Sequence, residues 1–264
     1  MLPLRITRFK FCSLLARLNP LHRFMATAKS TDVGFLGQQD SIAIDQELVN
    51  TYKFTVEQLM EVAGLNVADI VADIYPKQHE SDKVLICVGP GHNGGDGLIA
   101  ARHLLSFGVN PVIFCPKRAK SIVLERLIEQ VEAVSIPILD TLPSTDTISK
   151  EYSLVLDCLF GFSYKPPIRK PFDDVLRSLV NVKVPLISLD IPSGWDVEQG
   201  PGDVAEDMRL QPETLISLTA PKLGSKHFKG KHHFLGLRMV PPQLLKKFGV
   251  NFPLIPGTKQ YIEI

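Results

Sequence analysis

The stretch Cys87–Gly97, CVGPGHNGGDG, combines five glycines with three polar side chains, those of His92, Asn93 and Asp96. It follows an apolar run and precedes a helical pattern, GLIAARHLLSF. Glycines let backbone N–H groups approach an anion closely, and the N-terminus of a following helix adds a favourable dipole. The stretch therefore predicts a loop that binds a phosphate-bearing ligand. The alternative is a tight strand–helix turn in which Asp96 only caps the helix.

Two further aspartates stand at the ends of later apolar runs. Asp157 lies in LDCLFG, and Asp190 lies in LDIPSG, three residues before Ser193. A carboxylate at the end of a buried strand needs a partner, because an unpaired buried charge is unfavourable. Amide, carboxylate and hydroxyl oxygens suit a hard cation, so Asn93, Asp157 and Ser193 can share one metal site. Asp190 would then face the ligand as an acid–base group.

Basic residues leave other interpretations open. Both aspartates can instead cap loops or pair with Lys222 or Arg169. Arg118 follows the second apolar run, where a dinucleotide-binding loop of the usual kind expects an acidic residue for the ribose hydroxyls. An arginine there can hold a 2′-phosphate, so an NADP-dependent oxidoreductase is an alternative to acid–base chemistry at Asp190.

The elements that must position these residues alternate along the chain. Strands are predicted at 83–89, 111–115, 153–159, 184–190, 214–219 and 233–240, with helices near 96–107, 120–134 and 171–180. Short continuous apolar runs are typical of strands buried on both faces, and their alternation with helices predicts parallel βαβ units. The predicted fold class is α/β, a three-layer α/β/α Rossmann-like domain with a mainly parallel, doubly wound sheet.

An N-terminal helical extension precedes the first strand. Residues 40–75 carry two helical patterns, and the second starts at Thr55, with Gln58 three residues on as a capping box. The whole of 32–264 reads as one domain, since 264 residues with 45% hydrophobic and 22% charged residues are ordinary for a single globular unit. The cysteines show no C-x-x-C spacing, which favours free thiols over disulfides or zinc.

Residues 1–31 differ in composition from the rest. They carry six basic residues and no acidic one among leucines and phenylalanines, which predicts a mitochondrial transit peptide. A start at Met25 would give a cytosolic form without this leader. Basic residues interrupt its apolar runs, so no membrane span is predicted. The remainder of the chain is net acidic, which argues against nucleic acid as a partner.

Five motifs in this order resemble the NAD(P)H-hydrate epimerase family, the YjeF N-terminal domain. They are LMEVAG (59–64), GPGHNGGDGLIAARHL (89–104), LDCLFGF (156–162), LDIPSGWDVEQG (189–200) and TAPKLG (219–224). The terminal stretch 233–257 is similar to the animal members, some of which are named for binding apolipoprotein A-I. The resemblance covers residues 33–260, and the combination is far more specific than the glycine motif alone.

The resemblance implies a cofactor-repair enzyme, an isomerase that interconverts the R and S forms of hydrated NADH and NADPH. A separate S-specific dehydratase would then restore the cofactor, and the enzyme would be a homodimer. Asp190 would be the catalytic carboxylate and a ligand contact, and Asn93, Asp157 and Ser193 would hold a potassium ion. The other expected ligand contacts are His92, Asn93, Gly94, Gly95, Asp96, Gly161, Phe162, Ser163, Tyr164, Lys165, Pro166 and Pro167.

The sequence departs from the family pattern at two places. The usual Asn-Asn pair is His92-Asn93 here, which alters the first ligand contact of the loop. Two prolines at 166–167 replace more flexible residues, which makes the contacts expected from 164–167 less secure. A non-catalytic scaffold of the same fold is a third alternative, although Asp157, Asp190 and Ser193 together argue against it.

Overall fold

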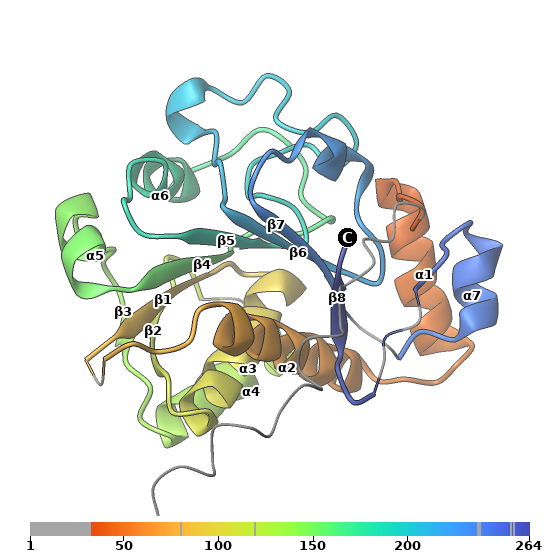
Figure 1. Cartoon of the computed structure of the whole chain (residues 1–264), viewed down its shortest axis with the longest axis horizontal. Coiled ribbons are helices and arrows are strands. Elements are labelled where there is room, and N and C mark those ends of the chain that lie inside the picture. The colour runs from red at the N-terminus through yellow and green to blue at the C-terminus, as the bar shows by residue number, and fades with distance from the viewer. Residues whose placement is uncertain (1–32, 80, 119, 237–238, 254, 256) are drawn as a thin grey trace, which may run out of the picture.

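An eight-stranded sheet runs through the part of the chain that the computed structural model describes, residues 33–264 without 80, 119, 237–238, 254 and 256 (Figure 1). The strands lie in the order β3-β2-β1-β4-β5-β6-β7-β8. All neighbours are parallel except β7 and β8. Their bounds are β1 Lys83–Val88, β2 Asn110–Phe114, β3 Ile138–Leu139, β4 Leu154–Cys158, β5 Leu186–Leu189, β6 Thr214–Leu218, β7 His232–Gly236 and β8 Tyr261–Glu263.

The strand order reverses between β1 and β4, which confirms the predicted doubly wound, mainly parallel sheet. The predicted transit peptide, residues 1–31, and the alternative start at Met25 lie outside the described residues. No helix within the described ranges is both long and apolar enough to cross a membrane. Cys87 and Cys158 are buried free thiols, and the free thiol of Cys115 is half-buried.

Helices cover both faces of the sheet. On one face α2, α3 and α4 pack in one apolar cluster, and on the other α5 and α6 pack in a second. A third cluster joins α1 to α7 beside the sheet, at the edge where β7 and β8 lie (Figure 1). The bounds are α1 Gln38–Asn50, α2 Val56–Ile74, α3 His92–Ser106, α4 Ile122–Ala133, α5 Thr145–Glu151, α6 Phe172–Leu179 and α7 Pro242–Lys247.

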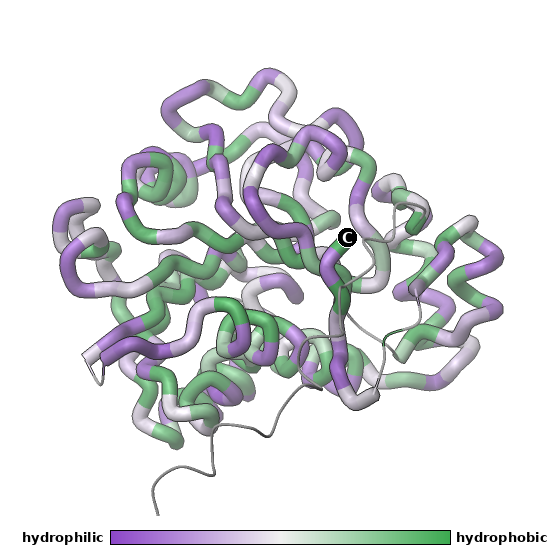
Figure 2. The backbone as a smooth tube through the Cα atoms, in the orientation of Figure 1, coloured by the Kyte–Doolittle hydropathy of each residue, from purple (hydrophilic) through white to green (hydrophobic). Residues whose placement is uncertain are grey.

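Strand β1 shows why its apolar run is continuous. Val84 and Ile86 belong to the cluster under α2–α4, whereas Leu85 and Cys87 belong to the cluster under α5 and α6. Successive side chains of a strand point to opposite faces, so a strand covered on both sides must be apolar at every position. The backbone trace accordingly shows apolar residues following the central strands (Figure 2).

Helix α2 begins where the sequence predicts. The Thr55 hydroxyl accepts the backbone N–H of Gln58, and the Gln58 side chain accepts the backbone N–H of Thr55. This capping box satisfies two N–H groups that a helix start would otherwise leave without partners. The helix then lies along α3, which brings its apolar face to the edge of the site described below.

Two short strands, β3 and β8, and two short α-helices, α5 and α7, are absent from the sequence-based prediction. Their two to seven residues are too few for a periodic pattern to stand out. The two-residue strand β3 and the helix α5 lie in 138–151, where serine, threonine, aspartate and proline residues are typical of a loop. Strand β8 depends on its partner, because it pairs antiparallel with β7 and Tyr261 packs edge-on against Phe234 at 5.6 Å.

The prediction that the third helix begins near residue 96 is wrong, because α3 begins at His92. The glycine stretch is therefore mostly the first turns of a helix. Its glycines allow close packing: a Cβ at Gly94 would lie 1.9 Å from the Gly89 carbonyl oxygen, and one at Gly95 would lie 2.0 Å from the Met60 methyl carbon. Helix propensity disfavours glycine, but here the packing against neighbours requires it.

Alanine at Gly94 is expected to lower the free energy of unfolding by about 3 kcal/mol or more, because the new methyl group would overlap a backbone oxygen that cannot move aside. Gly91→Ala is the matched control. A Cβ at Gly91 would meet nothing within 4 Å, so its cost should stay within about 1 kcal/mol. Urea unfolding, monitored by circular dichroism, measures the free energy of unfolding of both variants. Equal costs for the two variants would contradict the packing role.

Candidate active site

A cavity of about 360 Å³ lies at the carboxyl ends of the strands, where open α/β sheets bind their ligands. Helices α1 and α2 form its apolar side, and the start of α3 and the residues after β4, β5 and β6 form its polar side. The apolar lining is Leu36, Ile44, Val49, Val56, Leu59, Met60, Ala63 and Leu218. The polar and loop lining includes Ser41, Asp45, His92, Asn93, Asp96, Gly161, Phe162, Ser163, Asp190, Thr219 and Lys222.

The structure brings most of the predicted contact residues to this cavity. His92, Asn93, Asp96, Gly161, Phe162, Ser163 and Asp190 all line it. The other expected contacts lie elsewhere. Gly94 and Gly95 are buried against Gly89 and α2, and Lys165, Pro166 and Pro167 are exposed in the outer part of the loop after β4. Tyr164 stacks on Phe160 in the same loop, with ring centroids 4.9 Å apart.

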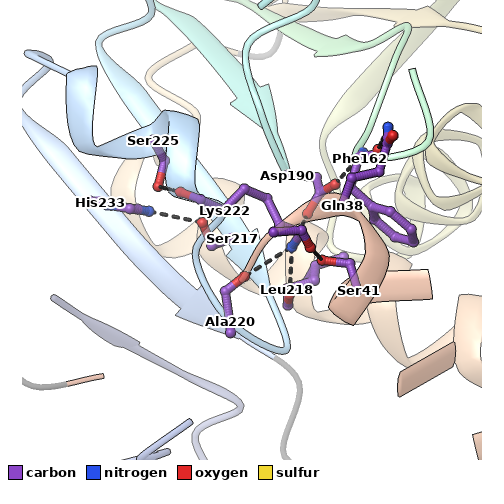
Figure 3. Close-up of polar contacts among 11 residues, drawn as sticks. Gln38, Ser41, Phe162, Asp190, Ser217, Leu218, Ala220, Lys222, Ser225 and His233 are labelled. Carbon is purple, nitrogen blue, oxygen red and sulfur yellow. Dashed lines mark hydrogen bonds and ion pairs between the residues drawn. The ribbon is translucent and has the colours of Figure 1, made fainter. Parts of the chain in front are cut away.

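A buried ion pair joins Asp190 to Lys222 (Figure 3). Lys222 Nζ lies 2.6 Å from Asp190 Oδ1, and the two side chains are only 2% and 7% exposed. Lys222 also donates to the carbonyl oxygens of Ala220 and Leu218, at 2.9 and 3.3 Å, so all three ammonium hydrogens have acceptors. The other oxygen, Asp190 Oδ2, accepts the backbone N–H of Phe162 at 2.7 Å. The prediction that an aspartate can pair with Lys222 is confirmed.

The first residue of α1 holds the loop that supplies this N–H group. Gln38 Nε2 donates to the carbonyl oxygen of Phe162 at 2.7 Å (Figure 3). It also donates to the carbonyl oxygen of Tyr164 at 3.0 Å. These bonds fix the loop after β4 against the N-terminal extension. The Phe162 N–H is thereby directed at the Asp190 carboxylate, so α1 positions a group of the cavity that lies more than a hundred residues away in the chain.

Asp157 and Ser193 form a second buried polar cluster, behind the cavity. Ser193 donates to Asp157 through its hydroxyl at 2.5 Å and through its backbone N–H at 2.9 Å. The Ser188 hydroxyl and the Leu159 N–H complete four hydrogen bonds to this carboxylate. Burial raises the pKa of Asp157, and these hydrogen bonds oppose the rise. Asp157 therefore does cap loops, as one alternative had it.

Asn93 lies beside Asp190 at the cavity. A Cβ at Gly161 would lie 3.1 Å from Asn93 Oδ1 and 3.0 Å from Asp190 Oδ2, so both oxygens face the same glycine. Asn93 Nδ2 is buried and has no hydrogen-bond partner among the described residues. A buried polar atom without a partner is uncommon in a folded protein, and this amide nitrogen, a donor, indicates a place where an acceptor of a ligand supplies the missing contact.

Asp96 does not cap α3, because the helix begins four residues before it. Its side chain is buried at the cavity wall, and its Oδ1 atom has no partner among the residues that the structure describes. Burial raises the pKa of Asp96 well above its ordinary value, and the negative charges of Asp190 and Asp45 raise it further. Asp96 therefore takes up a proton more readily than an ordinary carboxyl group, and its protonated form can donate a hydrogen bond into the cavity.

Sequence reasoning missed Asp45, a fourth carboxyl group of the site, which projects from α1. Burial raises its pKa to about 6; the positive charge of Lys222 opposes the rise, and the negative charge of Asp190 adds to it. One signal was available in the sequence. Ser41, Asp45 and Val49 are spaced by four, which places one aspartate on a single helix face beside the apolar positions Ile44 and Leu48.

Known proteins share this arrangement of elements. The family model described as "YjeF-related protein N-terminus" matches residues 56–224. A protein of Anopheles darlingi named NAD(P)H-hydrate epimerase is 45% identical over 230 residues, which cover 87% of this chain and 99% of the relative. The chain belongs to the YjeF-related N-terminal family. The crystal structure of yeast YNL200c, 34% identical, superposes with a TM-score of 0.82 and covers 88% of this chain and 100% of the yeast chain.

The segment that matches the family model contains the predicted metal ligands and the predicted catalytic residue of this YjeF-related domain. Residues 56–224 include Asn93, Asp157, Asp190, Ser193 and Lys222. The match begins after α1, so Gln38 and Asp45 precede the segment that the family model describes. The yeast structure shows that the fold of the family and the fold described above are the same over most of the chain.

Replacing Lys222 by Met in this YjeF-related domain is expected to cost about 3 kcal/mol of unfolding free energy or more, because Asp190 would lose its buried counter-charge. Lys170→Met is the matched control. Lys170 pairs with Asp174 at 3.6 Å, but its side chain is 80% exposed, so its loss should cost less than about 1 kcal/mol. Chemical denaturation measures both. A cost for Lys222→Met as small as that of the control would mean that the buried Asp190 carboxylate does not depend on Lys222 for its counter-charge.

Proposed function

We propose that this chain is an NAD(P)H-hydrate epimerase, an isomerase that interconverts the R and S forms of hydrated NADH and NADPH. The observation that carries the proposal is the Asp190 carboxylate, which is held at a largely apolar cavity by Lys222 and the Phe162 N–H. The name of the 45% identical relative supports the same activity. The sequence motifs and the acid–base groups of the cavity thus support the same activity.

The reaction changes the configuration of one ring carbon, C6, which carries a hydroxyl group beside the ring nitrogen. Protonation of the hydroxyl lets it leave as water, and the lone pair of the nitrogen stabilises the cation that remains. Water then adds to the other face of the ring and returns a proton. General acid–base help of this kind is typically worth about 10²–10⁴ in rate, and Asp190 is the group proposed to supply it.

The cavity suits such a ring. Its lining from α1 and α2 is largely apolar, which lowers the local dielectric and strengthens electrostatic interactions inside it. The negative charge of Asp190 would stabilise a cationic ring, and Asp96, whose pKa burial raises, can in its protonated form donate a hydrogen bond to a carbonyl oxygen or hydroxyl of the ligand. These features support a nicotinamide-like ring in the cavity, with the phosphates directed toward the N-terminus of α3.

The two alternative functions receive less support. Arg118, on which an NADP-dependent oxidoreductase depended, pairs with Glu132 at 3.0 Å on the surface, away from the cavity lining. A non-catalytic scaffold would not need a buried ion pair at a cavity, since a buried pair stabilises little compared with apolar residues of the same shape. Both observations favour the epimerase.

Asp190→Asn is expected to lower the rate of epimerisation by about 10²–10⁴, because the amide cannot exchange a proton with the ligand. The assay supplies mixed R and S hydrates with an S-specific dehydratase and follows consumption of the R form. Asp203→Asn, an exposed change in the loop after β5, is the control and should keep full activity. Undiminished R consumption by a folded Asp190→Asn variant would overturn the role of Asp190.

A potassium ion is the second part of the proposal. Asn93, Asp157 and Ser193 offer only oxygen ligands, and Asp157 and Ser193 are already in contact. The Asn93 amide oxygen would be the third ligand, and it faces Gly161 beside Asp190 Oδ2. This all-oxygen donor set fits a hard cation such as potassium. When bound, the ion would place positive charge at the carboxyl edge of the sheet, beside an anionic nucleotide.

Potassium is expected to raise the thermal midpoint of the folded protein, since an ion that binds only the folded state stabilises it. Thermal unfolding in potassium, sodium and choline chloride at equal ionic strength measures the effect. Asn93→Ala should lose the potassium-specific shift, whereas Asn251→Ala, an exposed change, should keep it. Identical midpoints of the wild type in the three salts would contradict the proposed ion site.

The remaining expectations rest on the family resemblance. They are functional pairing with a separate dehydratase, a homodimer, binding of apolipoprotein A-I, and import into mitochondria with a second, cytosolic form starting at Met25. The dehydratase-coupled assay above bears directly on the first. The others need measurements on cells and on the protein in solution, and we propose them only as consequences of the family.

A further inference from the structure

Asp45 reaches the cavity from a different wall than Asp190. It projects from the middle of α1, whereas Asp190 follows β5 at the carboxyl edge of the sheet. Both side chains line the same cavity and lie close enough to interact electrostatically. A ring bound between helix α1 and the sheet edge would therefore have one carboxyl group toward each side.

The two groups differ in how firmly they are held. Both oxygens of Asp190 accept hydrogen bonds, from Lys222 Nζ and from the Phe162 N–H. The carboxyl group of Asp45 interacts with its charged neighbours through space, without a hydrogen bond from a described residue. Both oxygens of Asp45 are consequently free to exchange a proton with a ligand.

The surroundings of Asp45 raise the pKa of its carboxyl group toward neutral pH. Lys222, after β6, attracts the charged form, whereas burial and Asp190, after β5, oppose it, so that its pKa is raised to about 6. Helix α3 contributes Asp96 and His92 to the same cavity wall, and the negative charge of Asp45 raises the pKa of Asp96. Helix α2 contributes apolar side chains, Val56, Leu59, Met60 and Ala63. Efficient acid–base groups titrate near the working pH.

We propose that Asp45 is a second catalytic carboxyl group of the epimerase, which exchanges a proton with the hydroxyl on the ring face that Asp190 does not serve. The inference rests on the proposed function and deepens it. Inversion at one carbon requires departure of water from one face and addition to the other. A single fixed carboxylate can serve only one face, unless the ring turns over inside the cavity.

The step balances with one proton shared between the two groups. Protonated Asp45 gives its proton to the C6 hydroxyl, the C6–O bond breaks with its electron pair on oxygen, and water leaves. The lone pair of the ring nitrogen forms a C=N bond. Water then attacks C6 from the other face, the C=N pair returns to nitrogen, and Asp190 accepts the released proton. Nothing is oxidised or reduced, and the reverse direction begins with Asp190 protonated.

The pH dependence follows from the shared proton. Either direction requires the pair to carry one proton, and Asp45 binds it with a pKa of about 6. The rate constant is therefore expected to fall as pH rises above about 6, approaching tenfold per pH unit, because the singly protonated pair becomes scarce. Asp45→Asn should abolish this fall, since the amide does not titrate.

The experiment measures conversion of the purified R hydrate to the S form by chromatography, without a dehydratase, over a range of pH. Asp45→Asn is expected to lower kcat by about 10²–10⁴ with little change in KM, and Asp45→Glu should restore part of the rate. Asp40→Asn is the matched control, since it makes the same change at an exposed position of the same helix. Thermal unfolding confirms that each variant is folded.

Three outcomes separate the two claims. Wild-type protein that does not interconvert the hydrates overturns the proposed function itself. Active wild type with a folded Asp45→Asn variant of similar kcat and an unchanged pH profile overturns the role of Asp45 and leaves the epimerase in place. Loss of kcat confined to Asp45→Asn, with the fall above about pH 6 removed, supports the second carboxyl group.

Discussion

The buried ion pair between Lys222 and Asp190 is the interaction on which the site depends. Two charges taken out of water are tolerated only when each is well paired and hydrogen-bonded, and here every hydrogen of the ammonium group has an acceptor. The pair joins the residues after β5 to the residues after β6. It also leaves Asp190 Oδ2 to accept the Phe162 N–H, which joins the loop after β4 to the same carboxylate.

Asp190 occupies this position at a conformational cost. Its φ of 69° lies in the left-handed region, which is uncommon for a residue other than glycine, although aspartate tolerates it better than most. Its backbone N–H donates to the Ile216 carbonyl oxygen at 2.6 Å, which holds the chain as it leaves β5. Backbone strain of this kind tends to occur at functional sites, and here the surrounding contacts sustain it so that the carboxylate faces the cavity.

The N-terminal helices complete the site. The β-strands alone would leave the carboxyl edge of the sheet open to water, and α1 and α2 close it with apolar side chains. Helix α1 also contributes Gln38, which fixes the loop after β4, and Asp45, which adds a carboxyl group. The cavity thus holds three aspartates in different surroundings: Asp190 is paired with the Lys222 ammonium group, Asp96 is buried with a strongly raised pKa, and Asp45 has a pKa raised to about 6.

The sequence by itself determined the layered fold and the polar site residues that follow the strands, because both depend on local patterns. Continuous apolar runs marked strands covered on both faces, and the polar residues after them had to meet at one edge of a parallel sheet. Only the tertiary structure decided which carboxylate pairs with Lys222, that the glycine stretch is a helix start, and that Asp45 belongs to the site. These depend on contacts between segments far apart in the chain, such as Gly95 of α3 against Met60 of α2, and α1 against the sheet edge, which no local spacing encodes.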